Sequence, residues 1–207
     1  MKTSKIFGHW LYVSFILFYS GTIFPNELFQ FKGAVVTSNA LATEAGEKIL
    51  AEGGNAYDAA TTISAMLSVV EPFASGLGGG AFWLIYDAKS KKYKMLDARE
   101  TAPLQSHKNM YLDENEDIIK NISTLGPLSA GIPGIPAVLS YVNDKYGSKK
   151  LSTLLDPAYK AAINGFPVNE RYLKGANYKK EWLKKYKETE AIFLDKGEVP
   201  KKGWILK

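Results

Sequence analysis

Arg99 is the residue of this sequence with the clearest potential for binding chemistry. It lies in the run LDARETAP, residues 96–103, just after a strand-like segment. A guanidinium group offers a planar fork of N–H donors that matches both oxygens of a carboxylate, which a lysine ammonium cannot do. The position therefore indicates a carboxylate-binding site. The alternative is an ion pair with Asp97, Glu100 or Asp113, the ordinary arrangement for a surface arginine.

Few other groups in the sequence suit acid–base, thiol or metal chemistry. There is no cysteine, which excludes disulfides, thiolate metal sites and a cysteine nucleophile. The two histidines are His9, in an apolar stretch, and His107, in a polar segment without a serine placed near it. A Ser-His-Asp triad or a two-histidine metal site therefore has almost nothing to be built from, and we predict no metal site.

A glycine cluster before Arg99 matches a dinucleotide-binding fingerprint in spacing but not in context. Gly76, Gly78 and Ala81 have the pattern G-x-G-x-x-A. That fingerprint needs a strand before it and a helix after it, so that the phosphate meets a helix N-terminus. Here a helix precedes and a strand follows, which argues against a dinucleotide. Either the glycines let two backbone segments cross closely, or they form a backbone wall beside a small ligand.

The segment before the glycines is predicted to hold a strand and two helices. The apolar run 34–36 predicts a short strand. Residues 43–52 predict a helix that ends at Gly53-Gly54, where glycine tolerates the left-handed conformation. Asn55 is a suitable N-cap for a second helix, which Glu71-Pro72 ends.

A β-hairpin is predicted to position Arg99. The extended runs 81–86 and 92–96 are joined by a polar turn, so Arg99 lies just beyond the second strand. Helices that precede an antiparallel pairing indicate a layered α+β fold and not a series of βαβ units.

The second half of the chain is predicted to be mostly helical. A rigid loop at 126–136 leads into a helix to Lys145, with Pro136 in its first turn. Asp156-Pro157 is predicted to open another short helix, which Gly165 closes. Residues 169–186 predict a longer amphipathic helix.

Composition indicates one globular domain without a nucleic-acid partner. The 207 residues are 46% apolar and 23% charged, which is typical of a folded soluble protein. The net charge of +5 is mild, and the lysines after Lys145 are mixed with glutamates. That mixture indicates a solvated helix face.

The first 31 residues form a separate unit. Lys2 and Lys5 precede an almost wholly apolar stretch, residues 7–24, which is the order of an export signal. No small-x-small cleavage site stands out, so the segment is interpreted as a cleaved signal peptide or an uncleaved membrane anchor. We predict an exported protein, periplasmic or extracellular, whose globular domain covers residues 32–207.

Five motifs together resemble the large subunit of gamma-glutamyltransferase, also called gamma-glutamyltranspeptidase or glutathione hydrolase. They occur in that family's order and at compatible separations, and the resemblance covers nearly everything from Ala34 onward. The motifs are GGNAYDAA (53–60), VVEPFASGLGGGAFWLIYD (69–87), LDARETAP (96–103), LSAGIPGIPAVL (128–139) and NGFPV (164–168).

The resemblance implies a fold, an activity and a role for one residue. The fold would be the four-layer αββα arrangement of N-terminal nucleophile hydrolases, with only its N-terminal part present. The activity would be transfer of the gamma-glutamyl group of glutathione to an amino acid, a peptide or water, by a secreted proenzyme that also yields a small subunit. In that family the arginine of the RETAP motif holds the substrate's alpha-carboxylate, and Arg99 occupies this position. Acyl transfer of this kind needs no metal or organic cofactor.

One departure from the family pattern is important. The family's nucleophile is a threonine that begins a threonine-rich, histidine-containing motif, and this sequence has no such motif. Thr37, Thr43, Thr61 and Thr101 lie in other motifs, so no catalytic residue is assigned to this chain, which is predicted to be inactive alone. A smaller departure is Ala98, where the family commonly has glycine. Two alternatives remain: a non-catalytic binding protein built on the same half-fold, and a related acylase acting on beta-lactam side chains.

Overall fold

The computed structural model describes residues 33–207, so the predicted signal peptide or anchor at 1–31, and His9 within it, lie outside the described residues. Val35–Lys207 forms one compact unit. Among the helices of this described part, none combines the length and apolar character needed for a membrane span.

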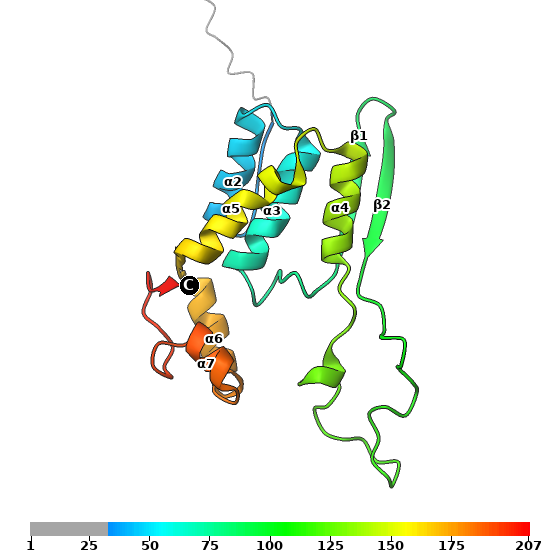
Figure 1. Cartoon of the computed structure of the whole chain (residues 1–207), viewed down its shortest axis with the longest axis vertical. Helices are drawn as coiled ribbons and strands as arrows, with labels where there is room; N and C mark the ends of the chain where they lie inside the picture. Colours follow the sequence, from blue (N-terminus) through cyan, green and yellow to red (C-terminus); the bar gives the residue numbers. More distant parts are fainter. Residues whose placement is uncertain (1–32) are drawn as a thin grey trace, which may run out of the picture. The chain divides into compact units, whose positions relative to one another are not determined.

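Four helices pack together in this unit (Figure 1). They are α2 (Ala40–Ala51), α3 (Ala56–Val70), α4 (Ile135–Tyr146) and α5 (Leu151–Asn164), with α3 in contact with the other three. The small residues of α2 and α3, such as Ala42 and Ala59, allow close packing, and α5 inserts the fully buried Leu154 against Ile49 and Ala59.

Asparagine caps fix where the first two helices begin. The Asn39 side chain accepts a hydrogen bond from the Leu41 N–H, so α2 starts at Ala40, earlier than the predicted residue 43. Asn55 caps α3 as predicted, and it forms a reciprocal capping box with Asp58.

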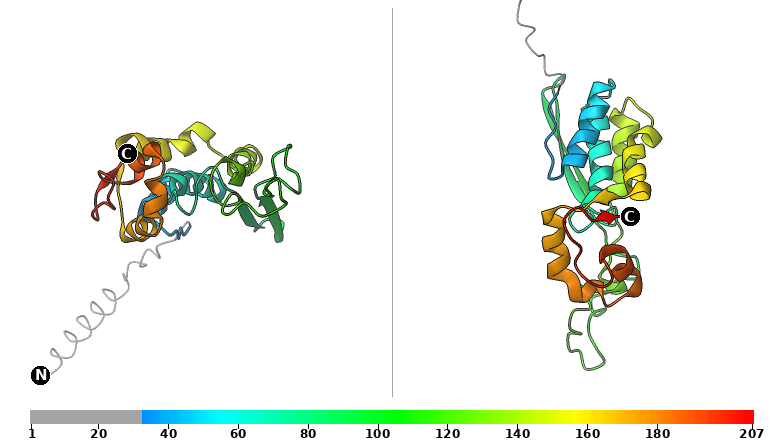
Figure 2. Two further views of the ribbon diagram at one scale, coloured as in Figure 1. Left: turned by 90° about the horizontal axis from the view of Figure 1, so that it is seen from below. Right: turned by 90° about the vertical axis from the view of Figure 1, so that its left-hand side faces the viewer.

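The predicted hairpin is confirmed. Strands β1 (Ala81–Asp87) and β2 (Lys92–Ala98) pair antiparallel, with Ala81 opposite Ala98 and Trp83 opposite Leu96. Trp83, Leu96 and Ala98 pack with Val138 and Val142 of α4. The helices cover one face of the hairpin (Figure 2). The other face carries a row of large apolar side chains that are more than half exposed: Phe82, Leu84, Tyr86, Tyr93 and Met95.

The C-terminal part contains further small elements. A 3₁₀ turn, η1 (Pro127–Ser129), precedes α4, while α6 (Glu170–Leu183) and α7 (Lys187–Phe193) follow α5. A two-residue strand, β3 (Phe166–Pro167), pairs antiparallel with β4 (Ile205–Leu206).

Three predictions about elements were wrong or incomplete. Residues 34–36 are not a strand, because nothing in the described chain pairs with them. Helix α5 begins at Leu151 and not at Asp156, so Pro157 lies inside it. The free energy gained by burying Leu154 and Ala158 offsets the loss of the backbone hydrogen bond that Pro157 cannot donate. The helix predicted over 169–186 ends at Leu183, and α7, β3 and β4 were not predicted.

The fold class is confirmed as α+β. Helices lie on one face of a short antiparallel sheet, which matches one side of an αββα arrangement.

Candidate functional site

Three backbone segments meet around Arg99 and hold its position. The Thr101 N–H donates to the Ile132 carbonyl at 3.1 Å, and the Ile132 N–H donates back to the Thr101 carbonyl at 2.8 Å. The N–H groups of Gly134 and Ile135 both donate to the Gly79 carbonyl at 3.2 Å. The glycine run, the end of β2 and the start of α4 are thus tied together, with Arg99 in the middle segment.

Glycine is required where these segments cross. A Cβ atom on Gly134 would lie 2.1 Å from the Ala98 carbonyl oxygen, and one on Gly80 would lie 2.7 Å from the Arg99 Cα atom. Both distances are shorter than any real contact of that kind. The helix-before, strand-after context of the glycine run is also confirmed by α3 and β1. The glycines therefore serve close backbone approach, one of the two interpretations left open by the sequence.

The Arg99 side chain lies just beyond β2, as predicted, and its guanidinium reaches the end of the hairpin face that the helices leave uncovered. Ala98 faces α4 and is buried, whereas the Arg99 guanidinium lies 5.9 Å from the ring centre of Phe82 on the uncovered face of the hairpin. The Arg99 side chain is 61% exposed. It is thus available to a ligand at the end of that face.

The surface ion pair considered from the sequence exists, but it uses only part of the guanidinium. The Arg99 Nε atom lies 2.9 Å from a carboxylate oxygen of Glu100. Asp97 instead accepts a hydrogen bond from the Arg99 backbone N–H at 3.0 Å. Within residues 33–207, Asp113 does not contact Arg99, and the two terminal NH₂ groups of Arg99 donate to no other side chain. Those two groups form the edge that could bind a carboxylate in bidentate fashion.

Glu100 is held in its ionised form by its surroundings. Hydrogen bonds from its own backbone N–H and from Arg99, with a smaller contribution from the Gly80 N–H, keep the pKa of the Glu100 carboxyl below its ordinary value. A charged Glu100 fixes the Nε edge of Arg99 and leaves the opposite edge free.

A groove of about 520 Å³ opens beside Arg99. It is lined by the end of β2, by the segment before α4, and by Ala137, Val138 and Tyr141 of α4. Its polar groups come from Asp97, Arg99, Thr101 and Tyr141, and its apolar lining includes Met95 and Val138.

Asp58 anchors the far end of α4. Its carboxylate accepts hydrogen bonds from the Ser148 backbone N–H at 2.9 Å, the Ser148 hydroxyl at 2.5 Å and the Asn55 N–H at 2.9 Å. Burial by itself raises the pKa of Asp58, but these bonds and one from the Lys149 N–H outweigh it and hold the pKa below its ordinary value. Helix α4, which lines the groove, is thereby held at both ends, by Gly79 and by Asp58.

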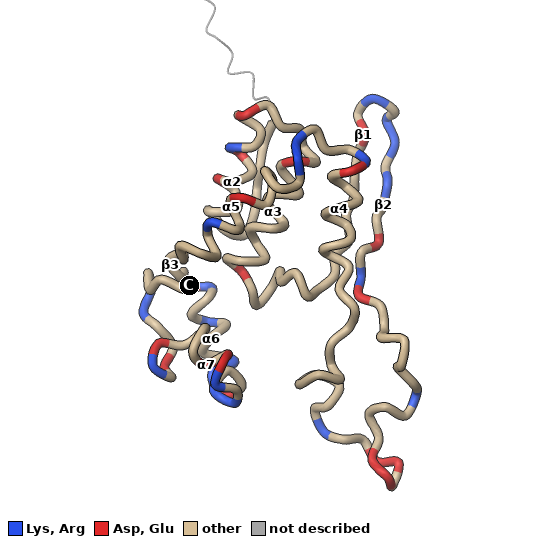
Figure 3. The backbone as a smooth tube through the Cα atoms, viewed as in Figure 1, with Lys and Arg blue, Asp and Glu red and all other residues tan. Residues whose placement is uncertain are grey.

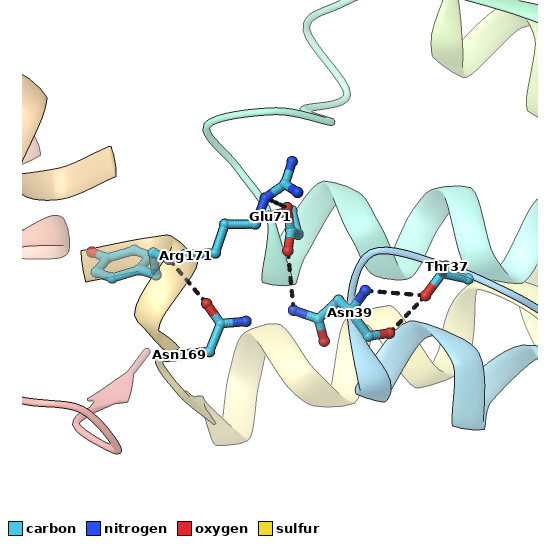
Figure 4. A network of polar contacts seen from close by, with 6 residues as sticks. Thr37, Asn39, Glu71, Asn169 and Arg171 are labelled. Atoms are coloured by element: carbon cyan, nitrogen blue, oxygen red, sulfur yellow. Dashed lines mark hydrogen bonds and ion pairs between the residues drawn. The ribbon is translucent and has the colours of Figure 1, made fainter. Parts of the chain in front are cut away.

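A second polar network joins α2, α3 and α6 (Figure 4). Glu71, which is 1% exposed, lies 2.9 Å from the Arg171 Nε atom and accepts a long hydrogen bond of 3.5 Å from the Asn39 amide. Glu71 begins the segment that leads to the glycine run. Sequence reasoning missed this pair, because no local signal links residues 100 positions apart.

The remaining candidates from the sequence do not gather at this site. The hydroxyl groups of Thr37 and Thr43 hydrogen-bond to each other at 2.8 Å, and Thr61 is fully buried in α3. His107 is exposed in the long segment after β2. Residues 33–207 contain no cluster of three or more His, Cys, Asp or Glu side chains that could hold a metal ion.

The solved structures that this fold matches are gamma-glutamyltranspeptidases, which places the chain in the class of N-terminal nucleophile hydrolases. A sequence profile described as gamma-glutamyltranspeptidase matches residues 42–207. The chain therefore belongs to the gamma-glutamyltranspeptidase family.

Individual relatives agree with this assignment. The glutathione hydrolase proenzyme of Pseudomonas sp. (strain A14) is 39% identical over 167 residues, which cover 80% of this chain and 29% of the relative. The crystal structure of Helicobacter pylori gamma-glutamyltranspeptidase is 40% identical, with a TM-score of 0.80, over 84% of this chain and 50% of that one. A cephalosporin acylase from Bacillus halodurans is 27% identical, with a TM-score of 0.68, over 81% of this chain and 32% of that one.

The chain thus spans about 29% of the length of the curated glutathione hydrolase relatives that it matches.

Proposed function

We propose that this chain is the N-terminal part of an exported gamma-glutamyltransferase, and that Arg99 binds the alpha-carboxylate of the gamma-glutamyl donor. The donor would be glutathione or a related compound, and the acceptor an amino acid, a peptide or water. The observation that carries the proposal is the free edge of the Arg99 guanidinium at the end of the uncovered sheet face. Glu100 binds the other edge, through Nε, and so orients the group.

In the complete enzyme, Arg99 would orient the donor by its amino-acid end. A bidentate contact fixes both the position and the plane of the carboxylate, so the gamma-carbonyl is delivered in a defined place. A threonine from the small subunit of the same precursor would attack that carbonyl, with its own amino group as base. Because Arg99 faces the open side of the hairpin, the attacking group would approach from the polypeptide that covers this side.

The acylase alternative has weaker support. The acylase structure has both the lower identity, 27% against 40%, and the lower TM-score, 0.68 against 0.80. A comparison of glutathione with a glutaryl amide as substrates of the complete enzyme distinguishes the two activities.

The sharpest test of the Arg99 assignment is a double comparison in the complete precursor. One donor has a free alpha-carboxylate, and the other carries the same group as an amide. The kcat/KM of each donor is measured for the natural enzyme, for Arg99→Ala and for Arg99→Lys. Loss of the bidentate contact to the donor carboxylate should cost about 3 kcal/mol, on the order of a 100-fold loss in kcat/KM for the free carboxylate. The amide donor should lose little, so the preference for the carboxylate should collapse in the variants.

Lys92→Ala is the matched control, because Lys92 is an exposed cation in β2, the strand that Arg99 directly follows. If Arg99→Ala retains the full preference for the carboxylate, Arg99 is not its partner. Reading the coding sequence past Lys207 tests the enzyme assignment itself. Continuation into a threonine-rich motif supports the enzyme, and an immediate stop supports the non-catalytic binding protein.

A further inference from the structure

Glu71 places a buried charge at the start of the segment that leads to Arg99. In the sequence it is the only charged residue between Asp58 and Asp87 (Figure 3). Its side chain is 1% exposed, and its carboxylate lies 2.9 Å from Arg171 Nε. Removal of a carboxylate from water is costly, and a well-packed apolar residue at such a position is often at least as stabilising. The ion pair is therefore better explained by the geometry that it fixes than by stability.

Helix α6 holds the beginning of this segment through two neighbouring side chains. Arg171 pairs with Glu71, and its guanidinium also lies 5.9 Å from the ring centre of Phe73. The next residue, Tyr172, meets Phe73 edge-on, with 6.3 Å between the ring centres. Asn169 fixes the start of α6, because its side chain accepts a hydrogen bond from the Tyr172 N–H at 2.9 Å (Figure 4). The segment is thus held by the capped end of a helix.

Backbone hydrogen bonds continue from Glu71 to the surroundings of Arg99. The Glu71 carbonyl accepts from the N–H groups of residues 74 and 75, both at 2.9 Å, and the Gly76 carbonyl accepts from the Gly79 N–H at 3.0 Å. Gly79 is in turn tied to the start of α4. The glycine after it lies so close to Arg99 that a Cβ atom there would be 2.7 Å from the Arg99 Cα atom. A displacement of Glu71 therefore has a continuous path to Arg99.

We propose that the ion pair of Glu71 with Arg171 positions the glycine run, and through it Arg99, for the donor carboxylate. This inference rests on the proposed role of Arg99 as the carboxylate ligand. Without Arg171, the buried carboxylate of Glu71 is unpaired, so it is driven toward water and displaces the turn that it begins. A bidentate contact needs the guanidinium in a defined place and plane, so a small displacement weakens it. Arg171 is thus a positioning residue that acts through Arg99.

Donor preference in the complete precursor tests the proposal. The measured quantity is the ratio of kcat/KM for a donor with a free alpha-carboxylate to kcat/KM for the corresponding amide. A purely structural role for Arg171 would lower both values by the same factor and leave the ratio unchanged. Arg171→Ala should lower the ratio about tenfold, the size expected for coupling through a packed segment. Glu71→Gln added to that variant should restore most of the ratio, because the neutral amide can stay buried without a charged partner.

Lys202→Ala is the matched control, because it breaks an exposed ion pair in the first turn of α6, between Lys202 Nζ and Glu170 at 2.8 Å. Its ratio should equal that of the natural enzyme. An equal loss in Lys202→Ala, or a loss in Arg171→Ala that Glu71→Gln does not relieve, would overturn the inference.

Arg99→Ala, measured alongside, separates this inference from the proposed function. If Arg99→Ala keeps the preference for the carboxylate, the assignment of Arg99 itself is wrong. If Arg99→Ala loses the preference and Arg171→Ala keeps it, the assignment of Arg99 stands and only the positioning role of Arg171 is refuted.

Discussion

Replacement of Asp58 should release the end of α4 from α3. Asp58 is fully buried and accepts hydrogen bonds from Asn55, Ser148 and Lys149, which join the start of α3 to the loop between α4 and α5. Asp58→Ala removes all of these bonds at once. Because α4 lines the groove beside Arg99, the loss should reach the candidate site.

The size of the effect follows from the contacts. Loss of the capping interaction at the start of α3 costs about 1 kcal/mol. The hydrogen bonds that Ser148 and Lys149 donate to the charged carboxylate would also be lost, which costs a further 2 kcal/mol or so. The total is about 3 kcal/mol in the free energy of local opening, a factor of roughly 150 in the opening equilibrium.

Native-state hydrogen exchange measures this opening directly. The amides of residues 55–58 and 146–149 should exchange roughly 150-fold faster in Asp58→Ala. Asp87→Ala is the matched control, because Asp87 also accepts hydrogen bonds from a hydroxyl and a backbone N–H, but in the solvent-exposed hairpin turn. Unchanged exchange at 146–149 in Asp58→Ala, or an equal change in Asp87→Ala, would refute the reasoning.

The same carboxylate should make this region sensitive to acid. The pKa of Asp58 is lower in the folded chain than its ordinary value of 3.8, because the hydrogen bonds outweigh the effect of burial. Its contribution to stability is therefore complete above about pH 3.8 and is lost as pH falls through the lower, folded-state pKa. Asp58→Asn should abolish this acid-dependent rise in exchange at 146–149, and a persistent rise in that variant would assign it to another group.

Three other results are expected. Gly134→Ala should lower the free energy of unfolding by about 3 kcal/mol, because the new methyl group would clash with the Ala98 carbonyl. Gly78→Ala should be tolerated, because the space around Gly78 is open. Soluble yield and circular dichroism compare the two variants. Arg171→Ala should lower the free energy of unfolding, measured in urea, by about 1–2 kcal/mol. This is less than for a fully buried pair, because Arg171 is half exposed. Adding Glu71→Gln to that variant should restore part of the lost stability, because it removes the unpaired buried charge. The 207-residue chain alone should show no transferase activity and should self-associate, since the apolar face of its hairpin is open; a monomer that unfolds cooperatively would contradict this.

The sequence determined the elements whose signals are local. The hairpin was predictable from two extended runs with a polar turn, and the start of α3 from Asn55, because these patterns depend on neighbouring residues only. The position of Arg99 beyond β2 followed from the same hairpin. Family motifs supplied the expectation of its role.

Tertiary structure decided everything that depends on distant residues. Helix α5 runs through Pro157 because Leu154 and Ala158 gain more from burial than the helix loses in one hydrogen bond. The run 34–36 stays unpaired because a strand needs a partner, which no local pattern can supply. The need for glycine at position 134 arises from the Ala98 carbonyl, and the buried charge of Glu71 is balanced by Arg171, two contacts that exist only once the chain has folded.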